Sequence, residues 1–382
     1  MKIVYSTGAR LAGGGIGDIA CHGVGSLHRA AMLQVLLCGS RGPSDLPSER
    51  VRALGPASRA LRRLAASDPS HRLWHLESLV YDAWAARALV PADLLVVWGG
   101  YGLRSMARAR AMGMATVVVR ASTHPAYQRR LLCEEYARWG LPYRVVEAAV
   151  RRAVQELDSA DHALIPSAFV RCSFLGQGYP QERLLEVPFG ADTARFRPAP
   201  ERAPHPFRVL FIGQVGVRKG VPYLLEAWRR LRWADAELWL VGRQEGSSRP
   251  LLARWQGLSG VRWLAYSPHP AALMQQADVF AFPTVEEGSA LVVYEALACG
   301  LPVVTTPHAG SVVRDGYEGF LVPIRDVDAL AERLERLRAD PDLRQAMGRA
   351  ARERAEDFTW QRHGQALCRC LAGLQGGSGR GR

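Results

Sequence analysis

Two glutamates eight residues apart, Glu287 and Glu295, are the first side chains in this chain whose type and spacing could do chemistry. Glu287 lies on a polar loop after the apolar run Val279–Phe282, which predicts a buried strand. Glu295 lies nearly two turns into a helix predicted over Ser289–Ala298. Carboxylates placed in this way can accept hydrogen bonds from sugar or ribose hydroxyls. The spacing fits equally a surface acid at a helix start and a solvated glutamate in mid-helix.

The elements around these acids form a strand–loop–helix–strand unit. Gly300–Pro302 ends the helix and leads into a second predicted strand, Val303–Thr306. Ligands of open α/β sheets bind at the carboxyl ends of strands, which is where the loop lies. We expect the N–H groups of residues 288–290 to be free and, together with the helix dipole, to favour an anion. The candidate binding residues here are Glu287, Gly288, Ser289, Ala290, Leu291 and Glu295.

Lysine is almost absent, whereas arginine is abundant: the 49 basic residues include only two lysines, Lys2 and Lys219. This bias suggests a drift in which arginine replaces lysine wherever either residue serves. A lysine that persists inside the chain therefore indicates a need for a compact ammonium, which the planar guanidinium cannot imitate. Lys219 lies in the glycine-rich segment Gly213–Gly220, after the predicted strand Phe207–Ile212, and is a candidate catalytic cation. The segment lacks the Gly-Lys-Ser/Thr of a Walker A loop.

A second glycine-rich segment, Gly13–Gly17, lies near the start of the chain. Residues 15–20 formally match a dinucleotide-binding fingerprint. The preceding strand, predicted over Lys2–Tyr5, ends about ten residues before Gly15, whereas that fingerprint requires an immediate turn from strand to helix. We therefore expect no nicotinamide cofactor.

A histidine, His124, comes shortly after the predicted strand Ala115–Val119. It could orient or polarise a sugar hydroxyl or the leaving phosphate, or it could serve only as a cap or packing residue.

In both halves of the chain strands alternate with helices, which predicts two doubly wound parallel sheets. Four prolines between residues 198 and 206 indicate a stiff linker between them.

The net charge of +13 allows nucleic acid, anionic lipid or acidic ligands as partners. The arginines are spread through predicted helices, so we expect no specific nucleic acid. The basic segment Ser48–Ser67 predicts either an amphipathic helix on anionic lipid or, because Gly55-Pro56 interrupts it, an ordinary solvated helix or loop. With no long apolar run and scattered cysteines, we expect a cytoplasmic protein, with peripheral contact at the inner membrane face left open. Asp326 of the formal Asp-x-Asp at 326–328 is predicted to be a helix N-cap rather than a metal ligand.

The segment Glu287-Gly-Ser-Ala-Leu-Val-Val-Tyr-Glu295, followed by Ala-Leu-Ala-Cys-Gly-Leu-Pro-Val-Val, resembles the E-x7-E signature of retaining GT-B glycosyltransferases of the family 4 type, the glycosyl transferases group 1. The segment Gly213–Gly220 is similar to the G-R-x3-K-G loop of this family, whose arginine and lysine neutralise the donor diphosphate. Gln214 stands at the arginine position here, and Arg218 beside Lys219 could supply the missing charge.

The same resemblance extends to the first half of the chain. The family carries a Gly-Gly that approaches the donor diphosphate, and Gly14 and Gly15 are the matching residues. It often carries a histidine that contacts the donor sugar, and His124 lies at that position. The resemblance implies a GT-B fold, in which two Rossmann-like doubly wound domains face a cleft.

The implied domains are an acceptor-binding domain at 1–198, a nucleotide-sugar-binding domain at 207–357, a helix that crosses back to the N-terminal domain at 358–374 and a disordered tail at 375–382. The implied activity is transfer of a sugar, with retention at the anomeric carbon, from a nucleotide-diphosphate sugar to a hydroxyl acceptor. The acceptor would be a saccharide, a lipid-linked glycan or a small molecule, in the synthesis of cell-surface polysaccharide, glycolipid or glycoconjugate.

His124, Lys219 and Glu287 are the catalytic candidates under this interpretation, and Glu295 would hold ribose hydroxyls. The nucleotide sugar is a co-substrate, and neither a cofactor nor a metal is implied. Two alternatives stay open. One is a non-catalytic protein that binds nucleic acid or membrane, which the positive charge suggests. The other is a sugar-nucleotide epimerase of the same fold.

Overall fold

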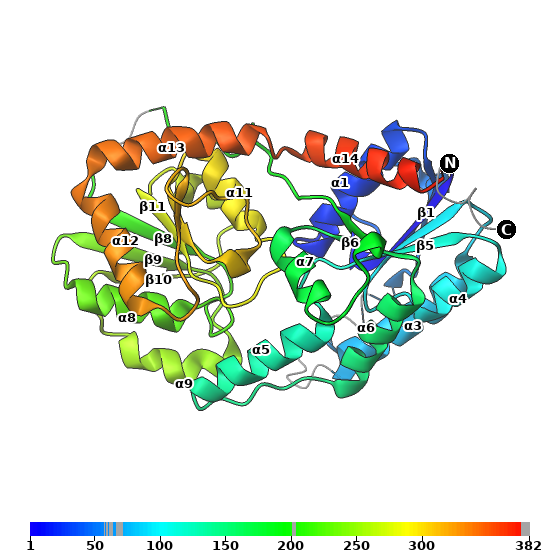
Figure 1. Ribbon diagram of the computed structural model, residues 1–382, viewed down its shortest axis with the longest axis horizontal. Helices are drawn as coiled ribbons and strands as arrows, with labels where there is room; N and C mark the ends of the chain where they lie inside the picture. The colour runs from blue at the N-terminus through cyan, green and yellow to red at the C-terminus, as the bar shows by residue number, and fades with distance from the viewer. Residues whose placement is uncertain (57, 59, 61–63, 66–71, 201–203, 376–382) are drawn as a thin grey trace. The chain divides into compact units, whose positions relative to one another are not determined.

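Two wholly parallel β-sheets organise the chain (Figure 1). The computed structural model describes residues 1–56, 58, 60, 64–65, 72–200 and 204–375. The chain forms two compact units. The first unit comprises Met1–Arg129, Arg144–Pro188 and Gln361–Arg382, and the second comprises Arg130–Tyr143 and Phe189–Trp360. The expectation of two doubly wound parallel sheets is therefore confirmed.

The sheet of the first unit has seven strands within the described residues, in the order β3-β2-β1-β4-β5-β6-β7. Its strand order reverses between β1 and β4, which pair directly in parallel. Helices α1 and α14 lie over one face and α3, α4 and α6 over the other (Figure 1). The elements are β1 (Ile3–Arg10), α1 (Ile16–Arg29), β2 (Leu33–Ser40), β3 (Val51–Ala53), α3 (Arg72–Ala88), β4 (Leu94–Trp98), α4 (Leu103–Ala111), β5 (Ala115–Val119), α5 (Pro125–Arg138), α6 (Glu147–Ser159), β6 (His162–Ile165), α7 (Ala168–Leu175), β7 (Leu184–Glu186) and α14 (Trp360–Ala372).

The sheet of the second unit has six strands within the described residues, in the order β10-β9-β8-β11-β12-β13. Here the order reverses between β8 and β11. Helices α8 and α12 pack together, and α11 packs against α13 (Figure 1). The elements are β8 (Phe207–Ile212), α8 (Val221–Leu231), β9 (Ala236–Val241), α9 (Arg249–Leu252), β10 (Val261–Leu264), α10 (Pro270–Met274), β11 (Val279–Phe282), α11 (Leu291–Ala298), β12 (Val303–Thr305), β13 (Gly319–Leu321), α12 (Val327–Ala339) and α13 (Pro341–Glu356).

Helix α5 is shared between the two units. Its first turn, from Pro125, clusters with the first unit, whereas Arg130–Tyr143 clusters with the second. The carboxylate of Glu135, which is completely buried, accepts hydrogen bonds from the Tyr223 hydroxyl at 2.6 Å and from Arg325 Nε at 2.6 Å. The helix therefore contributes side chains to the interior of a unit that otherwise begins some fifty residues later in the chain.

Strand β1 is longer than the sequence predicts, because it continues through Ser6, Thr7 and Gly8 to Arg10. Ser6 and Thr7 are completely buried despite their hydroxyls. The Ser6 hydroxyl is hydrogen-bonded to the Tyr81 hydroxyl at 3.1 Å, which removes the cost of burying it. The expected ten-residue separation between the strand and Gly15 is therefore wrong, since only residues 11–15 separate β1 from α1. Spacing alone no longer argues against the dinucleotide fingerprint.

The helix considered for Ser48–Ser67 is wrong at its start. Val51–Ala53 is strand β3, which pairs in parallel with β2. Val51 is buried and Arg52 is exposed, as alternation in an edge strand requires. Three of the arginines of this segment, Arg59, Arg62 and Arg63, lie outside the described residues.

The interpretation of Asp326 as a helix cap is confirmed. Its carboxylate accepts a hydrogen bond from the Ala329 N–H at 2.8 Å at the start of α12. Among the helices of the described residues, none has both the length and the apolar composition that crossing a membrane would need.

Candidate active site

Two loops lie side by side where the strand order of the second sheet reverses. The loop Gly213–Gly220 follows β8, and the loop Pro283–Ala290 follows β11, the neighbouring strand. The crevice at such a reversal is where open parallel sheets bind ligands. The loops are joined directly, because the Val285 N–H and the Thr284 hydroxyl both donate to the Arg218 carbonyl, at 3.0 and 3.1 Å.

Gly220 allows the close approach of these loops. It has φ +71°, and a Cβ at this position would lie 1.8 Å from the Pro283 carbonyl oxygen. Both the left-handed backbone and the missing side chain are therefore required here. Gly220 is also the N-cap of α8, so the lysine beside it stands at the start of a helix.

Lys219 and Glu287, two of the predicted catalytic residues, form an ion pair. Their side chains are only 11% and 16% exposed. Removal from water lowers the pKa of Lys219 and the Arg218 guanidinium lowers it further, whereas the Glu286 carboxylate raises it. The contact with Glu287 acts in the same direction as Glu286 and favours the charged ammonium. The site thus holds a shielded lysine, paired with a carboxylate, that an anionic ligand could engage.

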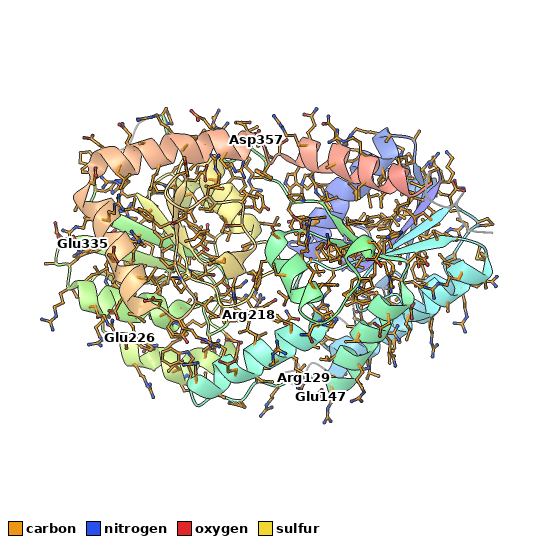
Figure 2. All side chains as sticks on the ribbon, viewed as in Figure 1. Arg129, Glu147, Arg218, Glu226, Glu335 and Asp357 are labelled. Atoms are coloured by element: carbon orange, nitrogen blue, oxygen red, sulfur yellow. The ribbon has the colours of Figure 1, made fainter. Side chains whose placement is uncertain are left out.

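Two acidic residues contact the guanidinium of Arg218. Its guanidinium contacts Glu286 Oε2 at 2.9 Å and Glu287 Oε1 at 2.9 Å, and it donates to the Glu286 carbonyl at 3.1 Å. Glu286 is completely buried. In Figure 2 Arg218 is labelled on the second unit, in the loop between β8 and α8. Arg218 therefore cross-links the two loops, and its charge is largely compensated by two carboxylates.

The acidic loop is fixed from its other side by residues that follow β12. The Glu287 N–H donates to the His308 carbonyl at 3.0 Å, and the Ala290 N–H donates to the Ala309 carbonyl at 3.0 Å. The expectation of a free N–H group is therefore wrong for Ala290. The His308 ring contacts the Val285 carbonyl through Nδ1 at 2.8 Å, and burial lowers the pKa of this histidine. These bonds join the acidic loop to the segment that follows β12.

The other residues predicted for this site lie on the same edge. Gln214 is exposed on the loop after β8, and Glu295 is half-buried in the second turn of α11. Ser289 is buried, and its hydroxyl is hydrogen-bonded to the Tyr294 hydroxyl at 2.8 Å. Gly288 is buried, whereas Leu291, the first residue of α11, is half-buried.

The remaining candidates belong to the first unit. Gly14 and Gly15 lie in the loop after β1, with φ +88° and +52°, and a Cβ at either would meet no atom within 4 Å. His124 follows β5 and is 7% exposed. Its Nδ1 accepts the Ala126 N–H at 3.3 Å, which leaves the proton of a neutral ring on Nε2. Burial and then Arg120 lower the pKa of His124 to about 4, so the neutral form prevails near pH 7.

Sequence reasoning missed two residues of this site, Glu286 and His308. Glu286 was read only as part of an acidic loop, although an acid that follows the apolar Val285 could have indicated a buried carboxylate. His308 lies three residues beyond the end of β12, at the edge where the other loops meet. That position was its one sequence signal.

Comparison with known proteins agrees with this geometry. Residues 206–340 match the family described as glycosyl transferases group 1. The chain is 31% identical over 214 residues to a putative colanic acid biosynthesis glycosyltransferase of Escherichia coli K12, with 52% of this chain and 53% of that protein aligned. It is 37% identical over 242 residues to a D-inositol 3-phosphate glycosyltransferase of Corynebacterium jeikeium, with 56% and 57% aligned. The alignments thus span little more than half the length of these relatives.

Solved structures resemble almost the whole chain. A sucrose-phosphate synthase from Thermosynechococcus elongatus has a TM-score of 0.75 at 19% identity, with 98% of this chain and 99% of that chain covered. HepE of Anabaena, in complex with UDP and glucose, has a TM-score of 0.67 at 16% identity, with 98% and 100% covered.

The two parallel Rossmann-like sheets and these structural relatives define the GT-B class of fold. The expected resemblance to the glycosyl transferases group 1 is confirmed, because residues 206–340 match that family and the relatives aligned with this chain are glycosyltransferases.

Proposed function

We propose that this protein is a retaining glycosyltransferase, which moves a sugar from a nucleotide-diphosphate sugar to a hydroxyl acceptor. The observation that carries the proposal is the pairing of Lys219 with Glu287 at the strand-order reversal of a sheet that belongs to this family. A shielded ammonium beside a helix start suits a diphosphate, and an acid beside it suits sugar hydroxyls.

In the proposed reaction the bond between the anomeric carbon and the donor phosphate oxygen breaks, and the acceptor oxygen forms the new bond on the same face. The proton of the acceptor hydroxyl passes to the leaving diphosphate, so no protein nucleophile takes part. Lys219 stabilises the charge that develops on that diphosphate. Glu287 would hold the hydroxyls of the transferred sugar, and Glu295 would hold those of the ribose.

The role that we propose for Arg218 differs from the one that its sequence position suggested. Because its guanidinium is bonded to both the carboxylate and the carbonyl of the completely buried Glu286, we assign Arg218 to joining the two loops, and we assign Lys219, at the start of α8, to the diphosphate. Neutral His124 would donate a hydrogen bond from Nε2–H to a sugar oxygen and would not act as a base. The parts of Gly14, Gly15 and Gln214 stay predictions. The reaction as proposed needs no metal or further cofactor.

The names of the relatives suggest the acceptor class. They include enzymes of colanic acid synthesis and of inositol phosphate glycosylation, and HepE was crystallised with UDP. We therefore propose a polyol or saccharide acceptor in the synthesis of a cell-surface polysaccharide or glycolipid.

The seven cysteines, all in the described residues, form no disulfide, which supports a reducing compartment.

The test is incubation of the protein with UDP-, GDP-, ADP- and TDP-sugars, with release of nucleoside diphosphate as the readout. Slow release from one donor class, lost in Lys219→Met, is the expected result. Binding of DNA or anionic vesicles that weakens with salt, without release from any donor, would overturn the proposal in favour of a basic binding protein.

A further inference from the structure

The loop Gly213–Gly220 depends on residues outside it for a fixed backbone conformation. It contains three glycines, Gly213, Gly216 and Gly220, which cost more conformational entropy to fix than other residues. A diphosphate site built from such a backbone gains affinity only if the loop is already ordered before the ligand binds. The residues packed behind the loop must therefore hold it.

A hydrogen-bonded chain of side chains lies behind this loop. The buried Ser248 hydroxyl accepts the Val217 N–H at 3.3 Å and donates to Glu245 Oε2 at 2.5 Å. The other carboxylate oxygen, Oε1, accepts the hydroxyl of Tyr136. Tyr136 is 3% exposed and lies on α5, in the part that clusters with the second unit. The chain thus runs from α5 through Glu245 to the backbone of the loop.

Backbone contacts and packing reinforce the same link. The Val215 N–H donates to the Arg243 carbonyl, and the Glu245 N–H donates to the Val215 carbonyl, both at 2.9 Å. A Cβ on Gly216 would lie 2.3 Å from Glu245 Oε2, so the carboxylate occupies the space that any other residue at 216 would need. Glu245 therefore touches the loop through its backbone and through its side chain.

We propose that Glu245 is a positioning residue for the donor diphosphate: it fixes the backbone of residues 215–217 through Ser248 and is itself fixed by Tyr136. The inference rests on the proposed function of this loop. The hydroxyls of Ser248 and Tyr136 both donate to the Glu245 carboxylate, one to each of its oxygens. In this proposal Glu245 acts on the ligand through the loop and not by contact with the substrate.

The first test measures the loop directly. Hydrogen exchange of the Val217 amide is compared in the wild-type protein, in Tyr136→Phe and in Tyr143→Phe. A hydrogen bond to a charged group is expected to slow local opening about tenfold or more, so Tyr136→Phe should accelerate exchange by that factor. Tyr143→Phe is the matched control, because it removes a tyrosine hydroxyl from the same segment and leaves the bond from the Tyr136 hydroxyl to Glu245 in place. Equal exchange in the wild type and in Tyr136→Phe would overturn the proposal.

The second test measures ligand affinity and separates the two proposals. UDP, GDP, ADP and TDP are titrated into the wild type, Glu245→Ala and Glu245→Gln. Glu245→Ala should weaken the bound diphosphate about tenfold and raise KM with little change in kcat, whereas Glu245→Gln, which keeps an acceptor for Ser248, should recover most of the affinity. Wild-type affinity in Glu245→Ala refutes the positioning role alone. Failure of the wild type to bind any of the four refutes the proposed function, while the exchange measurement still decides whether Glu245 fixes the loop.

Discussion

Replacing Lys219 by methionine removes one ammonium from the site while keeping an unbranched side chain of similar length. In the unliganded protein the loss is small, because Glu287 retains its contact with Arg218 at 2.9 Å. In the complex the loss is larger, since a hydrogen bond to a charged group contributes about 1.5–3 kcal/mol. The nucleoside diphosphate should therefore bind about 10- to 100-fold more weakly, with Tm changed by only a few degrees.

The chain offers a matched control for this experiment. Lys2 is the other lysine, and its ammonium donates to the Ala31 carbonyl, at 3.2 Å, in the first unit. Lys2→Met should bind the diphosphate as the wild type does. Calorimetric titration gives both affinities, and donor turnover should fall about 100-fold in Lys219→Met alone, because stabilisation of the leaving group is lost. Unchanged affinity and turnover in Lys219→Met would refute the assignment of the diphosphate to this loop.

Three further predictions concern stability. Gly220→Ala should lower the free energy of unfolding by about 3 kcal/mol, because φ +71° and the Pro283 carbonyl both oppose a Cβ. Arg325→Ala should lower it by about 3 kcal/mol, because it removes the cation bonded to the buried carboxylate of Glu135. The pKa of His124 is about 4 in the folded protein and about 6.5 in the unfolded chain, so between these pH values the unfolded chain binds the proton more readily. The free energy of unfolding should therefore fall as the pH drops from about 6.5 to about 4. The fall should be smaller in His124→Asn, which removes this titrating group.

Chemical denaturation checks all three, and each has its control. Gly257→Ala, where a Cβ meets no atom within 4 Å, should change stability by less than about 0.5 kcal/mol, and an equal loss in Gly220→Ala and Gly257→Ala would contradict the first. Arg230→Ala, which breaks an exposed pair with Asp328, should cost less than about 1 kcal/mol. A comparable loss there would contradict the second. Parallel curves for the wild type and His124→Asn across pH 4–6.5 would contradict the third.

The sequence predicted the centre of the second sheet well because its strands β8 and β11 are largely apolar runs that lie buried in the sheet. Strands β8 and β11 have the predicted bounds, and they are followed by a glycine and a proline respectively. Prediction failed where burial depends on partners far away in the chain. Ser6 reads as a strand end until Tyr81 is known to meet its hydroxyl.

The candidate site follows the same division. The pairing of Lys219 with the acidic loop could be foreseen, because both follow strands of one sheet and carry charged residues in glycine-rich surroundings. The compensation of Arg218 by Glu286 could not, because the local sequence does not say which cation a buried acid will contact. The bond from Tyr136 to Glu245 joins residues 109 positions apart, and no periodicity or spacing reports such a contact.

Helix α5 limits how this protein can be divided. A fragment limited to residues 206–340, the part that matches the family, would lack Glu135 and would leave Tyr223 and Arg325 without the carboxylate that binds both. Exchange of halves with a relative at the proline-rich segment would carry the same defect, because residues 130–143 would come from the wrong parent. A working chimera must therefore transfer this stretch of α5 together with the C-terminal sheet.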